Sequence, residues 1–132
     1  MIVVDTSAII AIIQSEPDAG QLMLTISAAA NLAIAAPTML EAHIVASSRF
    51  PVEGADLVRD LIDGSKITVI PFDAAQADIA GAWRRYGRGS GSPARLNFGD
   101  CFSYALALSL GAPLLFKGDD FGHTDVELVR VA

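Results

Sequence analysis

Met1-Ile2-Val3-Val4-Asp5-Thr6-Ser7-Ala8-Ile9-Ile10 is the stretch that decides the fold of this chain. The apolar residues 2–4, two of which are valine, predict a short buried strand, and Ala8 to Ile13 predict the helix that follows it. Asp5 falls at the end of that strand, which is where open α/β sheets place their ligand sites. A carboxylate among apolar neighbours has to be hydrogen-bonded, paired or metal-bound. The alternative is that Asp5 only caps the helix.

The rest of the chain repeats this alternation of strands and helices. Further strands are expected at residues 32–35, 67–70, 114–116 and, as a final edge strand, 127–131. Helices are expected at residues 19–30, 38–49, 52–63, 74–86 and 98–110. Thr38 is the expected N-cap of the third helix, with Glu41 completing a capping box, and Asn97 caps the last helix in the same way with Asp100. The sequence therefore predicts one α/β domain over residues 1–132, in which helices cover a mainly parallel sheet of four to five strands.

The composition sets limits on what the chain can be. Of its 132 residues, 52% are hydrophobic and 18% are charged, which predicts a folded chain with one large core. A single cysteine excludes an internal disulfide and fits a reducing compartment. No stretch reaches the roughly 20 apolar residues of a membrane span, and Asp5 interrupts the apolar start too early for a secretion signal. We therefore expect a cytoplasmic protein that has no contact with a membrane.

The net charge of −6 argues against a protein that coats nucleic acid nonspecifically, because such binding depends on Lys and Arg at phosphates. The distribution of charge weakens that objection. Four of the nine Lys and Arg residues lie within residues 84–95, and they are Arg84, Arg85, Arg88 and Arg95. These arginines are candidates for steering an RNA backbone, and the alternative is an ordinary solvated surface.

Four acidic residues stand where a predicted strand meets a predicted helix or turn. They are Asp5, Glu41, Asp100 and Asp119. Because the carboxyl ends of parallel strands meet at one edge of a sheet, we expect these carboxylates to converge there. Mg²⁺ and Mn²⁺ prefer carboxylate oxygens and water, whereas four such carboxylates without a cation would repel one another. Taken singly, each acid has another explanation: helix capping for Glu41 and Asp100, and turn formation for Asp119 and Asp120.

These motifs together resemble those of PIN-domain nucleases, and specifically the VapC group of toxin–antitoxin ribonucleases. The resemblance is carried by Glu41 and by three longer stretches, namely Val3–Ala8, Leu96–Ala107 and Leu114–Phe121. It runs nearly from end to end of the chain. One position departs from the pattern, since Gly118 stands where many members have Asp, Asn or Ser. That departure leaves open whether Asp119 or Asp120 is the fourth carboxylate, and we expect Asp119.

The resemblance implies a PIN-like three-layer sandwich and a Mg²⁺-dependent endoribonuclease, with Mn²⁺ as the alternative metal. Asp5 and Asp100 would be the principal metal ligands, and Glu41 would support the metal or orient the attacking water. Thr6 or Ser7 would donate a hydrogen bond to the Asp5 carboxylate. In this mechanism, water activated by the metal attacks an RNA phosphodiester in line and leaves a 5′-phosphate and a 3′-hydroxyl.

The resemblance also implies two protein partners, a cognate VapB-type antitoxin and a second copy of the chain in a homodimer. Trp83 is expected in the core rather than stacked on an RNA base, and Cys101 as a small buried residue. Two rival functions remain at this point. One is a phosphotransfer domain that uses an aspartate, although Ser7 stands where a phosphatase of that type has its second Asp. The other is a non-catalytic binding module on the same fold.

Overall fold

The computed structural model of this chain describes residues 1–129, apart from the side chain of residue 82. Within these residues, four parallel strands form one sheet in the order β3-β2-β1-β4. The strands are β1 (Ile2–Val4), β2 (Leu32–Ala35), β3 (Thr68–Ile70) and β4 (Leu114–Leu115). β1 is an inner strand, and Val3 pairs with Ala33 on one side and with Leu114 on the other. The predicted parallel sheet of four to five strands is confirmed.

The expected edge strand at residues 127–131 is wrong for the part of it that the structure describes. Leu128 makes only an isolated bridge to Leu114 and belongs to no strand. Residues 130 and 131 of that prediction lie outside the described part of the chain.

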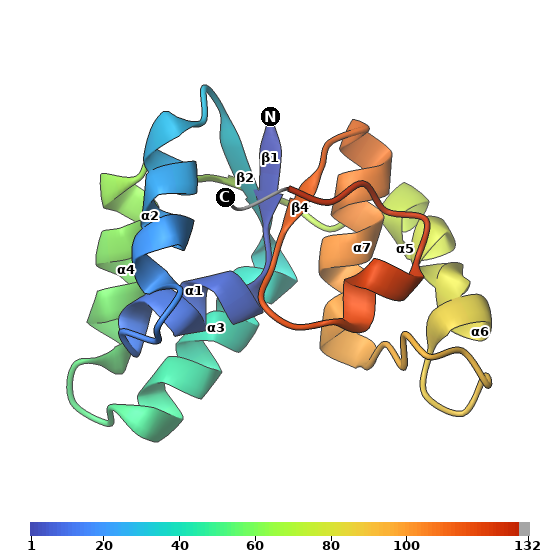
Figure 1. The fold of residues 1–132 in the computed structure, drawn as a ribbon, viewed down its shortest axis with the longest axis horizontal. Coiled ribbons are helices and arrows are strands. Elements are labelled where there is room, and N and C mark those ends of the chain that lie inside the picture. Colours follow the sequence, from blue (N-terminus) through green and yellow to red (C-terminus); the bar gives the residue numbers. More distant parts are fainter. Residues whose placement is uncertain (130–132) are drawn as a thin grey trace.

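Helices cover both faces of the sheet (Figure 1). One face carries α1 (Thr6–Ile13), α2 (Ala19–Ala28), α3 (Ala36–Arg49) and α4 (Gly54–Gly64). The other face carries α5 (Ala74–Ile79), a 3₁₀ turn η1 (Ala80–Ala82), α6 (Trp83–Tyr86) and α7 (Phe98–Leu110). A second 3₁₀ turn, η2 (Asp120–His123), follows β4. The arrangement is the three-layer sandwich that the alternating pattern predicts.

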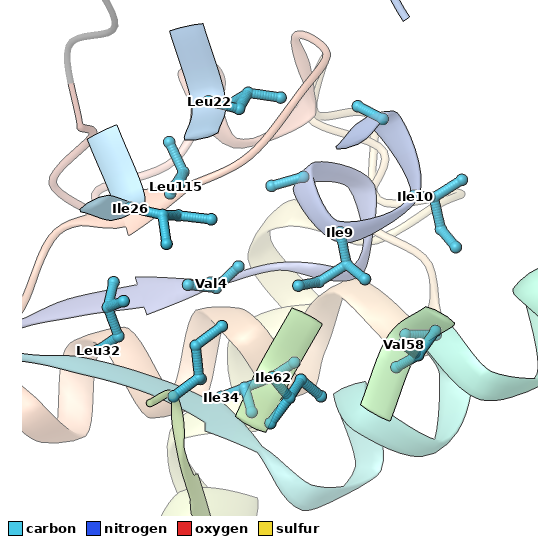
Figure 2. Packing of buried hydrophobic residues seen from close by; sticks show 14 of the residues in the cluster. Val4, Ile9, Ile10, Leu22, Ile26, Leu32, Ile34, Val58, Ile62 and Leu115 are labelled. Carbon is cyan, nitrogen blue, oxygen red and sulfur yellow. The ribbon is translucent and has the colours of Figure 1, made fainter. Parts of the chain in front are cut away.

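Alternate residues of each strand face opposite layers of helices, and this divides the core in two. Val4, Ile34 and Leu115 pack with residues of α1, α2, α3 and α4, and Figure 2 shows this cluster. Their neighbours Val3, Ala33 and Leu114 pack instead with α7 and the chain around it. Strands that are buried on both faces are nearly continuous apolar runs, which explains why these segments lack polar residues.

The predicted capping box of Thr38 and Glu41 is wrong, because α3 begins two residues earlier than expected. Ala35 occupies the N-cap position without a side-chain hydrogen bond, and Pro37 lies in the first turn. Proline suits that turn, since its fixed φ is helical and its missing N–H would have no partner there. Thr38 is therefore inside the helix and completely buried, and its hydroxyl lies 3.4 Å from that of Ser103 on α7.

The expected helix at residues 74–86 is interrupted. Asp73 caps it as predicted, because its side chain accepts a hydrogen bond from the Gln76 N–H. The regular helix ends at Ile79, and the 3₁₀ turn η1 separates it from the four residues of α6. Gly81 lies in this turn, and glycine is a poor helix former because it loses much backbone freedom when it is ordered.

The carboxyl ends of the strands all point toward one edge of the sheet, at which α1 and α3 begin (Figure 1). The first turn of α7 lies at the same end of the molecule. The last helix follows its prediction closely, with Asn97 as its N-cap and Gly111 in the left-handed conformation after its end. Within residues 1–129, no helix combines the length and the apolar character that a membrane crossing requires.

Candidate active site

Asp5 is buried at the carboxyl end of β1, with 3% of its surface exposed. It is the N-cap of α1, and its Oδ2 accepts hydrogen bonds from the backbone N–H of Ser7 (3.0 Å) and from the Ser7 hydroxyl (2.7 Å). Its Oδ1 accepts a further hydrogen bond of 2.5 Å from the hydroxyl of Ser103. Asp5 therefore caps the helix, as one reading of the sequence predicts, and is also held from across the sheet by α7.

Glu41 projects from α3 toward the same edge, where hydroxyl and glycine neighbours fix its carboxylate. The Thr6 hydroxyl lies 2.5 Å from Glu41 Oε1, to which it donates, and 3.2 Å from the carbonyl of Thr38. On the other side Glu41 lies against Gly99, where an added Cβ would be only 2.0 Å from Oε2. Gly99 therefore makes room for this carboxylate beside the first turn of α7.

Asp100 lies in the first turn of α7, where it forms the predicted capping box. Its Oδ2 accepts a hydrogen bond of 3.0 Å from the N–H of Asn97, whose side chain accepts one of 2.9 Å from the N–H of Asp100. Burial, which disfavours the charged carboxylate, is the main reason that the pKa of Asp100 rises from 3.8 to about 6. The negative charges of Asp5, Asp120 and Glu41 raise this pKa further, in that order.

The charge acting on Asp100 also bears on the choice between Asp119 and Asp120. Asp119 is exposed and immediately precedes η2, and it makes no side-chain cap. Asp120 is the first residue of η2, and its charge is among those that raise the pKa of Asp100. This favours Asp120 as the fourth carboxylate of the cluster, although Asp119 stays the prediction from sequence.

Each of the two predicted hydroxyl donors follows the end of β1, and they serve different carboxylates. Ser7 donates to Asp5, as expected, and its Oγ in turn accepts a hydrogen bond of 2.9 Å from the N–H of Lys117. Thr6 donates to Glu41 instead.

Sequence reasoning missed Ser103, Thr38 and Gly99 as residues that position the acids. The only sequence signal for Ser103 is a small polar residue in the otherwise apolar run of residues 101–108, three positions after Asp100.

The donor set fits a hard divalent cation. Within residues 1–129, no three His, Cys, Asp or Glu side chains already form a compact group that could hold a metal ion. The available oxygens are nonetheless carboxylates, the type that Mg²⁺ and Mn²⁺ prefer together with water. Asp5 and Asp100 therefore suit the predicted role of metal ligands.

The four predicted RNA-binding arginines separate into two pairs. Arg88 and Arg95 line a hollow of about 860 Å³ together with Asp120 and the glycine-rich loop. Arg84 and Arg85 line a different hollow, beside Tyr104 and Asp125, and Arg85 lies 3.8 Å from the Asp125 carboxylate. The carboxylate of Asp125 accepts a hydrogen bond from the Tyr104 hydroxyl, and burial is the main reason that the pKa of Tyr104 is raised. The first pair thus shares a hollow with Asp120, whereas the hollow of the second pair, as the described residues line it, contains none of the predicted acids.

The core prediction for Trp83 is wrong, since 49% of this side chain is exposed. It lies with Phe98 and Phe102 along an apolar hollow on the outer side of α7. Cys101 is a free, buried cysteine, as expected.

Comparisons with known proteins agree with this architecture. Residues 2–127 match the PIN domain family. Ribonuclease VapC42 of Mycobacterium tuberculosis is 48% identical over 125 residues, which are 94% of this chain and 95% of that protein. Ribonuclease VapC28 of the same organism is 44% identical over 126 residues, which are 95% of each chain.

A solved structure shares the fold at low sequence identity. The crystal structure of Mycobacterium tuberculosis VapC20, described as a sarcin–ricin loop cleaving toxin, superposes with a TM-score of 0.79 at 17% identity. The superposition covers 98% of this chain and 99% of VapC20. Together with the identities to VapC42 and VapC28 over almost the whole length, these similarities establish that the chain belongs to the PIN domain family and, within it, to the VapC ribonucleases.

Proposed function

We propose that this chain is a metal-dependent endoribonuclease and the toxin of a VapBC-type toxin–antitoxin module. Its relatives at 44–48% identity are named as VapC ribonucleases. The observation that carries the proposal is geometric: Ser103 of α7 donates a hydrogen bond to Asp5, and Glu41 lies against Gly99, the residue before Asp100. Acids from distant parts of the sequence therefore share one site at the edge of the sheet.

The proposed ligands of the metal are Asp5 and Asp100, with Mg²⁺ as the cation and Mn²⁺ as its substitute. Glu41 and a fourth carboxylate, Asp119 or Asp120, complete the catalytic set. When bound, the cation supplies Lewis-acid polarisation of a phosphodiester and lowers the pKa of water.

The side chains around this set hold two of the acids in one orientation. Three donated hydrogen bonds fix the carboxylate of Asp5. Glu41 is held through Oε1 by Thr6, which leaves Oε2 directed toward Gly99 and the first turn of α7. In the proposed mechanism, Oε2 would orient a water molecule and accept its proton as the water attacks phosphorus. Hydrolysis by in-line attack would leave a 5′-phosphate and a 3′-hydroxyl.

Cleavage of a labelled RNA by the purified chain, with Mg²⁺ or with EDTA, tests this proposal. We expect metal-dependent cleavage that Asp5→Ala and Asp100→Asn each reduce by at least about 100-fold, as is typical when an essential group is removed. Asp60→Asn on the exposed side of α4 is the matched control and should leave the rate unchanged.

Each rival function makes a different prediction in the same experiment. Formation of an acyl phosphate on Asp5, without RNA cleavage, would support the phosphotransfer domain. If the wild-type chain neither cleaves RNA nor forms an acyl phosphate, the result would support a non-catalytic binding module.

The proposed partners are a VapB-type antitoxin, RNA and a second copy of this chain. Solved relatives include a complex titled VapBC-1 from nontypeable Haemophilus influenzae, which superposes with a TM-score of 0.71 at 21% identity. An apolar surface formed by Leu40, Ile44, Phe98 and Phe102 beside Glu41 supports self-association, since large exposed apolar patches are typical of interfaces. Phe98 is 78% exposed in the single chain and lies two residues from Asp100.

A further inference from the structure

We propose that Arg88 and Arg95 form a phosphate-binding subsite for the RNA strand, next to the phosphodiester that is cleaved, and that Arg84 and Arg85 take no part in it. The inference rests on the proposed ribonuclease function and adds to it the place at which the strand is held. The four arginines form a single cluster in the sequence, and the proposal assigns phosphate binding to only two of them.

The hollow beside the glycine-rich loop has the size and the chemistry for such a subsite. Its volume of about 860 Å³ falls within the range of roughly 300–1,000 Å³ that is usual for ligand sites. Two guanidinium groups and one carboxylate, that of Asp120, are the charged groups among its lining residues. The balance of charge in the hollow is therefore positive in a chain whose net charge is −6.

The loop that carries the two arginines is pinned at both ends. The N–H of Arg88 donates to the carbonyl of Leu96 (3.0 Å), and the N–H of Leu96 donates to the carbonyl of Tyr86 (2.8 Å). Between these ends, the Ser90 hydroxyl donates to the carbonyl of Gly87 (2.6 Å). Arg88 and Arg95 thus leave the two sides of a closed loop at fixed positions, which lowers the entropy cost of binding a ligand between them.

The backbone of Arg95 supports a role for its side chain. Its φ of 50° lies in the left-handed region, which costs a residue with a side chain more than it costs glycine. Two glycines of the same loop, Gly89 and Gly91, also have positive φ, so the chain readily places glycine where this conformation is needed. The chain therefore accepts the backbone strain of a positive φ at a position whose charged side chain lines the hollow.

Arg85 differs from Arg88 and Arg95 in its partners. Arg85 lies 3.8 Å from the Asp125 carboxylate, and its guanidinium is 5.5 Å from the centre of the Tyr86 ring. Within residues 1–129, Arg88 and Arg95 take part in no ion pair, so their charges are available to a phosphate.

The hollow adjoins the first turn of α7, which carries Asp100. Arg95 lines the hollow and lies two residues before Asn97, whose N–H donates to the Asp100 carboxylate (3.0 Å). A strand whose phosphate binds between Arg88 and Arg95 would therefore run directly past the carboxylates. This continuity is what places the bound phosphate next to the cleaved one.

The experiment measures binding of a fluorescein-labelled oligouridylate in EDTA by anisotropy, as a function of salt concentration. Each phosphate contact contributes about 0.7 to the slope of log affinity against log salt for single strands. We expect Arg88→Ala/Arg95→Ala to reduce the slope by about 1.4. Between 50 and 200 mM salt, wild-type affinity should thus fall about sevenfold more than that of the double variant. Arg84→Ala/Arg85→Ala is the matched control and should keep the wild-type slope.

Cleavage kinetics give an independent readout of the same contacts. Loss of a contact that is equal in the ground and transition states raises KM and leaves kcat unchanged, and this is the result expected for the Arg88/Arg95 double variant. Arg88→Lys/Arg95→Lys keeps both charges and should recover most of the salt slope.

The possible outcomes separate this inference from the proposed function. The proposed subsite is refuted if the salt dependence of RNA binding falls equally in the Arg88/Arg95 and Arg84/Arg85 double variants. It is also refuted if the salt dependence falls in neither. A wild-type chain that cleaves no RNA, but whose slope falls only in the Arg88/Arg95 variant, refutes the ribonuclease and keeps the subsite. Arg95→Gly separates loss of binding from loss of folding. This variant should bind RNA more weakly, yet its melting temperature should equal or exceed that of the wild type, because glycine relieves the strain of the positive φ.

Discussion

The hydroxyl of Ser103 donates a hydrogen bond to the carboxylate of Asp5, although 98 positions separate the two residues in the sequence. This buried bond links α7 to the residue that follows β1. The hydroxyl oxygen of Thr38 on α3 lies 3.4 Å from the same serine hydroxyl. Three elements therefore meet at one buried serine, which fixes the orientation of the acid that we propose as a metal ligand.

Ser103→Ala should lower the affinity for Mn²⁺ and the rate of RNA cleavage by about 10-fold or more, since removal of a residue that orients a metal ligand typically has that effect. The free energy of unfolding should fall by only about 1–2 kcal/mol, the usual consequence of leaving a buried polar group without its partner. Calorimetric titration with Mn²⁺ and urea denaturation measure the two effects.

Ser109→Ala is the control for this prediction, because it makes the same change on an exposed turn of α7. Unchanged Mn²⁺ affinity in Ser103→Ala would show that the serine serves packing alone.

Asp100→Asn should stabilise the metal-free chain at high pH and leave its stability nearly unchanged at low pH. The folded pKa of about 6 exceeds the ordinary value of 3.8, so the folded chain binds the proton more tightly than the unfolded chain does. Ionised Asp100 therefore destabilises the folded wild-type chain. This destabilisation is absent below pH 3.8, grows as the pH rises and is complete above pH 6. We expect a gain of about 1 kcal/mol above that range, after allowance for partial solvent screening and the lost helix-dipole interaction.

Urea denaturation in EDTA at both ends of this pH range measures the gain, with Asp60→Asn as the control on α4. A variant that gains the same stability at low and high pH would contradict the raised pKa as its cause.

Gly99→Ala should displace the Glu41 carboxylate and reduce RNA cleavage strongly, because the new Cβ would lie 2.0 Å from Oε2. Because the clashing atom ends a flexible side chain, the carboxylate can move aside, and we expect a stability cost of only about 0.5–1.5 kcal/mol from the lost Thr6 hydrogen bond. In a double-mutant cycle, Glu41→Ala should remove most of this cost. Gly20→Ala in α2, where nothing lies within 4 Å, should instead stabilise the chain by about 0.5–1 kcal/mol.

The choice between the two neighbouring acids of η2 can be made by comparing Asp119→Asn with Asp120→Asn. Since the charge of Asp120 raises the pKa of Asp100, its removal should lower that pKa, and NMR titration of the Asp100 carboxyl carbon measures this. We also expect Asp120→Asn to reduce metal-dependent cleavage more than Asp119→Asn does. The reverse order would restore Asp119 as the fourth carboxylate.

Phe98→Ser should break the proposed homodimer into monomers without unfolding the chain. The side chain is 78% exposed, so its removal takes little from the core, whereas an interface that buried it would lose a large apolar contact. Sedimentation equilibrium measures the mass, and circular dichroism checks the fold. Val52→Ser, at a position that is 92% exposed and outside the apolar surface of Leu40, Ile44, Phe98 and Phe102, is the control.

The fold could be predicted because its elements are encoded locally. Residues 2–4 and 32–35 are apolar throughout, and Asn97 and Gly111 mark the two ends of α7. The errors arose where tertiary contacts override local signals. Thr38 has the sequence of an N-cap, yet its hydroxyl faces Ser103 inside the protein. Trp83 has the size of a core residue, yet the short helix α6 leaves it half exposed.

The acidic residues of the candidate site could be predicted from the sequence, but the residues that hold their carboxylates in position could not. Asp5 follows a strand, Asp100 lies in the first turn of α7, and Glu41 lies within the first two turns of α3, so the parallel topology brings them to one edge. The roles of Ser103 and Gly99 depend on how α7 packs against β1 and α3, and no local pattern specifies that packing. The division of the arginines likewise follows from the path of the loop at residues 87–96.

The central position of β1 has a consequence for synthesis of the chain. β1 is synthesised well before its neighbour β4 and before the helix that carries Asp100. Domains generally fold as units, so a nascent chain that carries Asp5 and Glu41 still lacks half of the acidic cluster. Translation that stops before residue 100 yields only fragments without a complete set of carboxylates. The proposed nuclease can therefore act only once translation has passed the residues that supply the second half of its acidic cluster.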